Sequence, residues 1–246
     1  MIFDQAEFNI RCEWGEQGIT NLAPVSDVLI VVDVLSFSTC VEIATNNSAV
    51  IFPYLWKDKS ALNYALSMNA ELASYERKLT NGYSLSSSSL VNIPANTRLV
   101  LPSPNGATLT LSTQQTQVIT GCLRNCEAVA NFAQKYGKRI SVIPAGERWN
   151  DGSLRPALED IIGAGAILSY LKGIFSPEAK ASVAIFQNTK DALLSTLKSC
   201  VSGKELTTRG FAKDVELAAA YNISECVPRF VNNAYIKQST TKLPAS

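Results

Sequence analysis

Short apolar runs alternate along the chain with stretches whose apolar positions recur at helical spacing. Val28–Leu35 is nearly all apolar with one acid inside it, the pattern of a strand buried on both faces of a parallel sheet. Lys57–Met68 places its alanines and leucines on one stripe, which predicts a helix. Further strands are predicted at Ala49–Tyr54, Glu71–Tyr75, Arg98–Leu101, Gln117–Thr120, Arg139–Ile143 and Pro228–Ile236. Further helices are predicted at Asn125–Tyr136, at Pro156–Leu171 and through most of the remainder to Ala220. This alternation predicts an α/β fold, a three-layer α/β/α arrangement around a mostly parallel or mixed sheet.

Local signals predict where some of these elements begin and end. Thr39 and Glu42 stand at capping-box spacing, so a helix is expected to start near them. Pro53 should end its strand or place it at a sheet edge, and the serine-rich Tyr83–Asn92 reads as a loop. Breaks in the last helical region are expected at Pro177, Gly203 and Gly210. Gly163 and Gly165 fall inside a predicted helix, which indicates close packing against sheet or backbone.

Length and composition narrow the class of protein. The 246 residues are expected to form a single unit, 1–246, which could comprise two intimate subdomains, with a frayed polar tail over Ser239–Ser246. With 22 basic and 21 acidic residues, nucleic-acid binding is not expected. No apolar run approaches the roughly 18 residues of a membrane span, so no membrane partner is expected either. Six dispersed cysteines and an N-terminus without the features of a secretory signal favour reduced thiols and a cytoplasmic location.

Histidine is absent, which changes the range of possible chemistry. Its absence excludes Ser–His–Asp triads, Cys–His pairs, phosphohistidine chemistry and His-rich metal sites. Acid–base chemistry must therefore use Asp, Glu, Lys, Tyr or Cys.

Polar segments follow the predicted strands, where open α/β sheets bind ligands. Asp33 ends a buried apolar run and must be paired or bound to a cation, as a metal ligand, a nucleophile or a structural acid. Pro102–Gly106 forms a turn whose N–H groups could face an anion, or a turn and nothing more.

Two further segments follow the strand at Arg139–Ile143. Gly146–Arg155 carries two arginines suited to phosphate, carboxylate or sulfonate groups, or is an exposed charged loop. Glu159 and Asp160 then fall in the first turn of the predicted helix after Pro156. They either complement the helix dipole or supply oxygen ligands to magnesium.

At these segments the sequence resembles the 2-phosphosulfolactate phosphatase family. The resemblance rests on the order and spacing of several motifs: Val31–Thr39 (VVDVLSFST), Ser103–Gly106 (SPNG), Ala145–Glu147 (AGE), Glu159–Gly165 (EDIIGAG), Ser202–Leu206 (SGKEL), Gly210–Phe211, Asp214–Val215 and Val227–Pro228. It implies a magnesium-dependent acid phosphatase of coenzyme M biosynthesis with a three-layer α/β/α fold. Asp33 would ligate the metal or attack phosphorus, Glu159 and Asp160 would complete the metal shell, and Glu147 would be catalytic.

The chain departs from the family at two places. Ser36 stands where the family commonly has arginine, and Ser86–Ser89 replace a Gly-Asn-Ser-Pro-like stretch. One of four arginines in distinctive contexts is expected to supply the missing charge. The residues predicted to bind the substrate are Arg11, Ser36, Ser38, Ser103, Asn105, Gly106, Arg124, Arg148 and Arg155.

These observations predict a Mg²⁺-dependent phosphatase acting on a small phosphorylated (sulfo)carboxylic acid such as 2-phosphosulfolactate. The alternative is a non-catalytic or differently specific protein that binds an anionic metabolite on the same fold. The sequence leaves open whether the chain forms a homo-oligomer.

Overall fold

A mixed sheet forms the centre of the computed structural model, which describes residues 2–55, 58–77, 82–113 and 115–238. The sheet order is β1-β7-β2-β6-β10-β11-β3-β5-β4, and β8 and β9 form a separate pair. The strands are β1 (Ile10–Cys12), β2 (Val28–Val32), β3 (Val50–Leu55), β4 (Glu71–Leu72), β5 (Arg98–Ser103), β6 (Gln117–Thr120), β7 (Ile140–Pro144), β8 (Glu147–Arg148), β9 (Leu154–Arg155), β10 (Pro228–Val231) and β11 (Ala234–Lys237).

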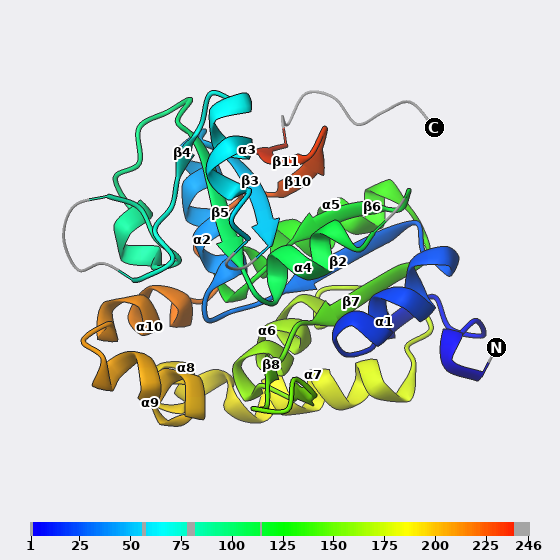
Figure 1. Cartoon of the computed structure of the whole chain (residues 1–246). Coiled ribbons are helices and arrows are strands. Elements are labelled where there is room, and N and C mark those ends of the chain that lie inside the picture. The colour runs from blue at the N-terminus through cyan, green and yellow to red at the C-terminus, as the bar shows by residue number, and fades with distance from the viewer. Residues whose placement is uncertain (1, 56–57, 78–81, 114, 239–246) are drawn as a thin grey trace.

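Helices cover both faces of this sheet (Figure 1). They are α1 (Gly15–Leu22), α2 (Phe37–Asn46), α3 (Ala61–Ser67), α4 (Gly106–Leu111), α5 (Cys126–Tyr136), α6 (Leu158–Leu168), α7 (Pro177–Thr189), α8 (Leu193–Ser199), α9 (Val201–Thr208) and α10 (Ala212–Ala219). None of the helices within the described ranges combines the length and apolarity needed to cross a membrane.

The alternation of β2 shows how the apolar run produces two cores. Val28, Ile30 and Val32 point to one face and pack in a cluster with residues of α5, α6 and α7. Leu29 and Val31 point to the other face, where residues of α1, α2 and α4 form a second cluster. The predicted α/β/α layering and the burial of this strand on both faces are therefore confirmed.

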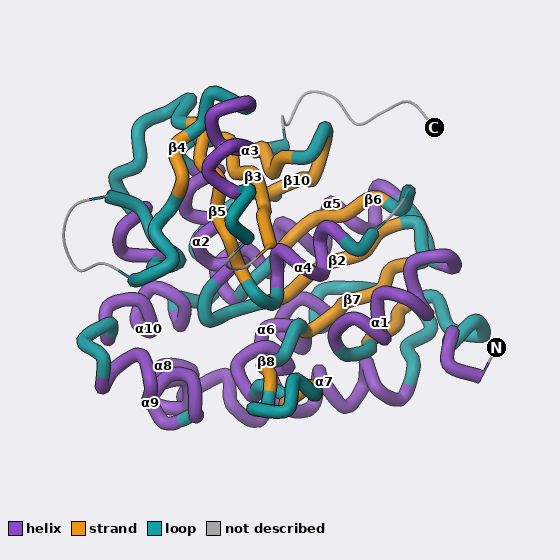
Figure 2. Tube along the Cα trace, viewed as in Figure 1, coloured by secondary structure: helices purple, strands orange, loops and turns teal. Residues whose placement is uncertain are grey.

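The β10–β11 hairpin joins two parallel groups of strands. β10 is antiparallel to β6 and β11 is antiparallel to β3, so the group β3-β5-β4 runs opposite to the group β1-β7-β2-β6. Figure 2 shows the two groups meeting at an angle. The backbone N–H of Gly106, after β5, reaches Asp33, after β2, which brings the carboxyl ends of both groups together.

One predicted strand and one predicted helix cap were wrong. Pro228–Ile236 is two antiparallel strands, because Asn232 and Asn233 adopt φ of 51° and 64° and make the tight turn between them. The second helix begins at Phe37, near the predicted start at Thr39. Thr39 donates instead from Oγ1 to Val34 O at 2.8 Å, a bond to the loop rather than a cap.

Proline and glycine also act differently from the prediction in places. The strand β3 continues through Pro53 to Leu55, because its pairing with β11 is at Ile51, two residues before the proline. Gly203 lies inside α9, where a Cβ would stand 1.7 Å from Leu197 O, so it permits close packing rather than ending the helix. Pro177 begins α7, as a proline at the first helical position does. The predicted tail, Ser239–Ser246, lies outside the described residues. So does Lys57, the first residue of the helix predicted at Lys57–Met68.

The glycines of α6 allow close contacts on two sides, as expected. A Cβ on Gly163 would stand 2.6 Å from Val34 Cγ2, and one on Gly165 would stand 2.1 Å from Ser182 O of α7. We expect Gly165→Ala to lower the free energy of unfolding by about 1–3 kcal/mol, because a backbone carbonyl cannot rotate away. Thermal unfolding measures this as a fall of about 2–4 °C per kcal/mol. Ser169→Ala is the control, because Ser169 is exposed near the end of the same helix. If Gly165→Ala melts at the same temperature as the wild type, the packing role of Gly165 is contradicted.

Candidate active site

Asp33 is held at the point where the two strand groups meet. It is 5% exposed, Oδ1 accepts from Phe37 N at 3.1 Å, and Oδ2 accepts from Gly106 N at 2.9 Å. Burial raises the pKa of this carboxyl above its usual range, while the two backbone donors act in the opposite direction. Each oxygen keeps a further lone-pair site, so the carboxylate is fixed in place and can still bind a ligand.

Asp160 ties together the loops after two neighbouring strands. Its Oδ1 accepts from Val34 N at 2.7 Å and its Oδ2 from Gly146 N at 2.9 Å. It lies in the first turn of α6 and is 3% exposed. Burial, and then the charges of Asp33 and Glu159, raise its pKa well above the usual range.

Glu147 has a pKa raised to near neutrality. Its Oε2 accepts from Asn105 Nδ2 at 2.9 Å. Burial and the nearby charge of Asp33 raise its pKa to about 7, although the bond from Asn105 opposes the shift. A carboxyl group with this pKa can donate or accept a proton near neutral pH.

Glu159 completes a cluster of four acids and is 2% exposed. Its charge raises the pKa values of the other three, Asp33, Glu147 and Asp160, so the four carboxyl groups lie close enough to repel one another. Carboxylate oxygens are the donors that hard divalent cations prefer, and a bound cation would relieve this repulsion. Within the described residues, however, no three acidic or thiol side chains converge as a ready-made metal shell.

A polar cavity of about 200 Å³ is lined by Asp33 and Glu147, whereas Glu159 and Asp160 do not line it. Five of the residues predicted to act in the site line it: Asp33, Ser36, Ser103, Asn105 and Glu147. Leu35, Pro104, Ser202, Glu205 and Leu206, which also line it, belong to the family motifs, whereas Tyr75, Arg77, Leu85 and Arg209 were not indicated by the sequence. Gly106 contributes its N–H to Asp33, and a Cβ there would stand 2.3 Å from Phe37 Cδ1.

Two predicted substrate ligands lie within the protein and do not line this cavity. Arg11 is 2% exposed and donates to the carbonyls of Gln5, Phe8 and Val25. Ser38 is fully buried and bonds to Thr120 Oγ1 at 2.7 Å. Both side chains therefore connect elements of the fold.

The other three predicted arginines bind neighbouring groups. Arg124 pairs with buried Glu42 at 2.5 Å. Arg148 pairs with exposed Glu16 and lines an adjacent cavity that also borders Asn105 and Glu147. Arg155 donates to Ser202 Oγ at 3.3 Å and acts electrostatically on Glu147.

Arg77 brings a positive charge to the serine that replaces the expected arginine. Its Nη2 donates to Ser36 Oγ at 2.9 Å, and the guanidinium lines the cavity. No motif surrounds Arg77, so the sequence did not single it out. A usable signal existed, since Arg77 follows β4, which runs parallel to β5 and therefore ends at the same edge.

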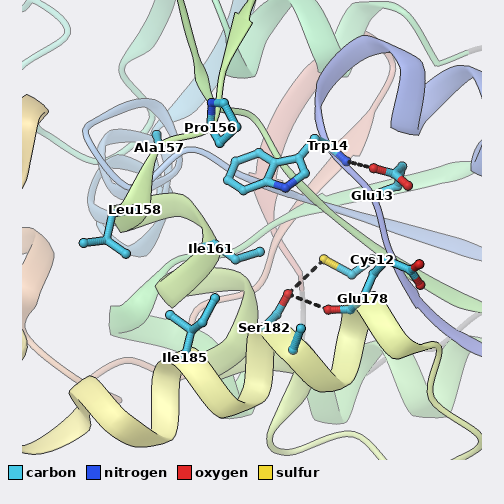
Figure 3. A pocket seen from close by; sticks show the side chains of 11 residues that line it. Cys12, Glu13, Trp14, Pro156, Ala157, Leu158, Ile161, Glu178, Ser182 and Ile185 are labelled. Atoms are coloured by element: carbon cyan, nitrogen blue, oxygen red, sulfur yellow. Dashed lines mark hydrogen bonds between the residues drawn. The ribbon is translucent and has the colours of Figure 1, made fainter.

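A second cavity, of about 490 Å³, lies between β1, α6 and α7 (Figure 3). Its lining is mostly apolar and includes Trp14, Leu158, Ile161 and Ile185, with Glu13 and Glu178 at one end. Apolar walls and carboxylates do not suit a phosphorylated acid. The smaller polar cavity is therefore the candidate active site.

Comparison with known proteins identifies the family that the chain resembles. The family model described as 2-phosphosulpholactate phosphatase matches residues 17–233. A 2-phosphosulfolactate phosphatase of Methanothermobacter thermautotrophicus is 32% identical over 130 residues, which cover 53% of this chain and 54% of that protein. A probable 2-phosphosulfolactate phosphatase of Thermotoga petrophila is 28% identical over 229 residues, covering 87% of this chain and 96% of that protein. The chain thus spans about half the length of the first of these relatives and nearly all of the second.

Proposed function

Because the chain belongs to the 2-phosphosulpholactate phosphatase family, we propose that it hydrolyses the phosphate ester of a small phosphorylated acid such as 2-phosphosulfolactate. The observation that carries this proposal is Glu147, an acid with a pKa of about 7 beside Asp33 in a small polar cavity. All six cysteines are buried free thiols, which supports a reducing compartment such as the cytoplasm.

Glu147 is the group that moves a proton in this proposal. The alkoxide of a hydroxy acid is a poor leaving group, so protonation of its oxygen lowers the barrier to P–O cleavage. Because its pKa is raised to about 7, Glu147 remains protonated in mildly acidic solution and can donate that proton. Asn105 Nδ2 holds Glu147 Oε2 and thereby orients the carboxyl group.

Asp33, Glu159 and Asp160 are proposed to hold Mg²⁺, directly or through water. For Asp33 we favour metal binding over attack on phosphorus, because both of its oxygens accept backbone N–H bonds that reduce their nucleophilicity. Both oxygens of Asp160 also accept backbone N–H bonds, which suits contact through water. When bound, the cation would neutralise charge on the phosphoryl oxygens.

The direct test is phosphate release from 2-phosphosulfolactate and 2-phospholactate with and without magnesium. We expect release that depends on magnesium. Saturable binding of these compounds without phosphate release would instead indicate a non-catalytic binding protein. If the protein neither binds nor hydrolyses them, the proposal is overturned entirely.

Magnesium binding provides a separate prediction. We expect chelator-treated protein to lose activity and to regain it with Mg²⁺, and Glu159→Gln to weaken Mg²⁺ binding in calorimetry at least about tenfold, because a buried carboxylate oxygen is replaced by a neutral amide. Glu178→Gln, a similar change on exposed Glu178 of α7, should leave Mg²⁺ affinity unchanged. Equal affinities for wild type and Glu159→Gln would remove Glu159 from the metal site.

A further inference from the structure

Arg77 occupies the side of the polar cavity formed by Ser36. Its side chain is 12% exposed, so its guanidinium has little contact with bulk water. Nη2 donates to Ser36 Oγ at 2.9 Å and Nη1 to Asp214 Oδ2 at 3.1 Å. These two bonds involve two of the five N–H donors of an arginine, so the fork retains donors that a ligand can use.

Asp214 and the ring of Phe211 hold the Arg77 guanidinium in position. Asp214, on α10, is fully buried and also accepts from Ser88 N at 2.9 Å, so the carboxylate cannot move with the arginine. The guanidinium carbon lies 5.9 Å from the centre of the Phe211 ring. A preorganised fork of this kind loses little side-chain entropy when an anion binds.

Both carboxylates and guanidinium groups line the cavity. Asp33 and Glu147 line it together with Asn105, whereas Arg77 and Arg209 line it from segments near α10. Arg209 lies 6.0 Å from the same Phe211 ring and pairs with the exposed Glu205 at 2.9 Å. A ligand that spans the cavity therefore meets both carboxylates and guanidinium groups.

We propose that Arg77 is a substrate-binding residue that holds a second acidic group of the substrate, a carboxylate or sulfonate, while the phosphoryl group lies beside Asp33 and Glu147. This inference rests on the proposed function and extends it to specificity. Arg77 would make the site select phosphorylated acids over simple phosphate monoesters, because a simple monoester has no second acidic group to bind the guanidinium.

Removing Arg77 alone would leave Asp214 as a buried charge without its ion-pair partner, which can unfold the protein. The test therefore uses Arg77→Ala together with Asp214→Asn, which removes both charges. Arg139→Ala is the matched control, since Arg139 pairs with Asp27 on the surface, before β7 rather than after it.

The readout compares 2-phospholactate with isopropyl phosphate, which has the same branched ester but no carboxylate. We expect the double variant to lower kcat/KM for 2-phospholactate about 10- to 100-fold, the effect of a lost charge-assisted contact, and to change that for isopropyl phosphate little. Arg139→Ala should change neither. Equal losses for both substrates, or no loss for either, would overturn the inference.

A binding experiment separates this inference from the proposed function. Sulfoacetate carries a carboxylate and a sulfonate but no phosphoryl group, and its affinity is measured by calorimetry. If wild type binds it and the double variant binds it at least tenfold more weakly, the role of Arg77 stands even where no phosphatase activity is found. If both bind it equally, or neither binds it, Arg77 is not the anion ligand even where phosphatase activity is present.

Discussion

Replacing Glu147 with Gln is expected to lower kcat by about 10²–10⁴-fold, the usual contribution of a positioned general acid. The introduced amide oxygen would still accept the hydrogen bond from Asn105 Nδ2, so the side chain should keep its place and lose its proton. Steady-state kinetics with 2-phospholactate measure the change. A variant with full activity would remove Glu147 from the proposed chemistry.

The pH profile gives the same residue a second signature. The pKa of Glu147 is raised from 4.5 to about 7, so the acid form is present below pH 7 and is lost as the pH rises through that value. Wild-type kcat should therefore fall above about pH 7, and that limb should be absent from the residual activity of Glu147→Gln. Glu13→Gln is the control, because Glu13 is a half-buried acid that accepts from Trp14 N outside the polar cavity.

Protonation of Glu147 should also make the free energy of unfolding depend on pH. A carboxyl whose folded-state pKa is raised favours the folded state in its neutral form, so its contribution is full below pH 4.5 and is lost as the pH rises to about 7. Glu147→Gln removes this loss. Relative to wild type, the variant should therefore gain stability in urea unfolding between pH 4.5 and pH 7.

The acids of the site could be predicted because each lies near the carboxyl end of an apolar strand or in the first turn of a helix. Asp33 follows β2 and Glu147 follows β7, and both ends face the same cavity. Local patterns carry this information, because a run of apolar residues predicts the strand and the end of the run marks the carboxyl end of that strand, where ligands bind. The same reasoning gave the three-layer architecture.

The reversal of the sheet could not be predicted in this way. It depends on the β10–β11 hairpin, which lies far along the chain from β6 and β3. A single strand was expected where the Asn232–Asn233 turn divides the segment into two. Strand order follows from long-range pairing, which periodicity does not encode. The turn itself had a local signal, because asparagine tolerates positive φ.

The arginines illustrate a different difficulty. A motif shows that a guanidinium is present but not which way it points. Arg11 follows Ile10 in the short strand β1, yet its side chain reaches the carbonyl of Val25, before β2, and so serves the opposite edge of the sheet. Arg77, which lies in no recognised motif, reaches Ser36 from another segment of the chain. The sequence therefore predicted that the site needs a positive charge, but only the fold shows which arginine supplies it.

Asp33 combines a structural role with a chemical one, and two substitutions separate them. Asp33→Ala would leave the buried N–H groups of Phe37 and Gly106 without their acceptor, at about 1–3 kcal/mol each, so the melting temperature should fall by about 10 °C. Asp33→Asn should lose less stability, because its Oδ1 can still accept one of the two bonds. Both variants should lose magnesium-dependent hydrolysis, since neither carries the negative charge that a cation requires.

Asp27 offers a matched control for the hydrogen-bonding role of Asp33. Its Oδ2 accepts from the backbone N–H groups of Lys138 and Arg139 at 3.0 Å and 2.9 Å, at the start of β7 rather than at the cavity. Asp27→Ala should therefore lower the melting temperature while leaving kcat unchanged at a temperature where the variant is folded. If Asp33→Asn, folded under the same conditions, hydrolyses 2-phospholactate at the wild-type rate with magnesium, then Asp33 is a structural acid. The metal would in that case have to be held by Glu159 and its neighbours, because Asp33 would supply only the two backbone bonds that join α2 to α4.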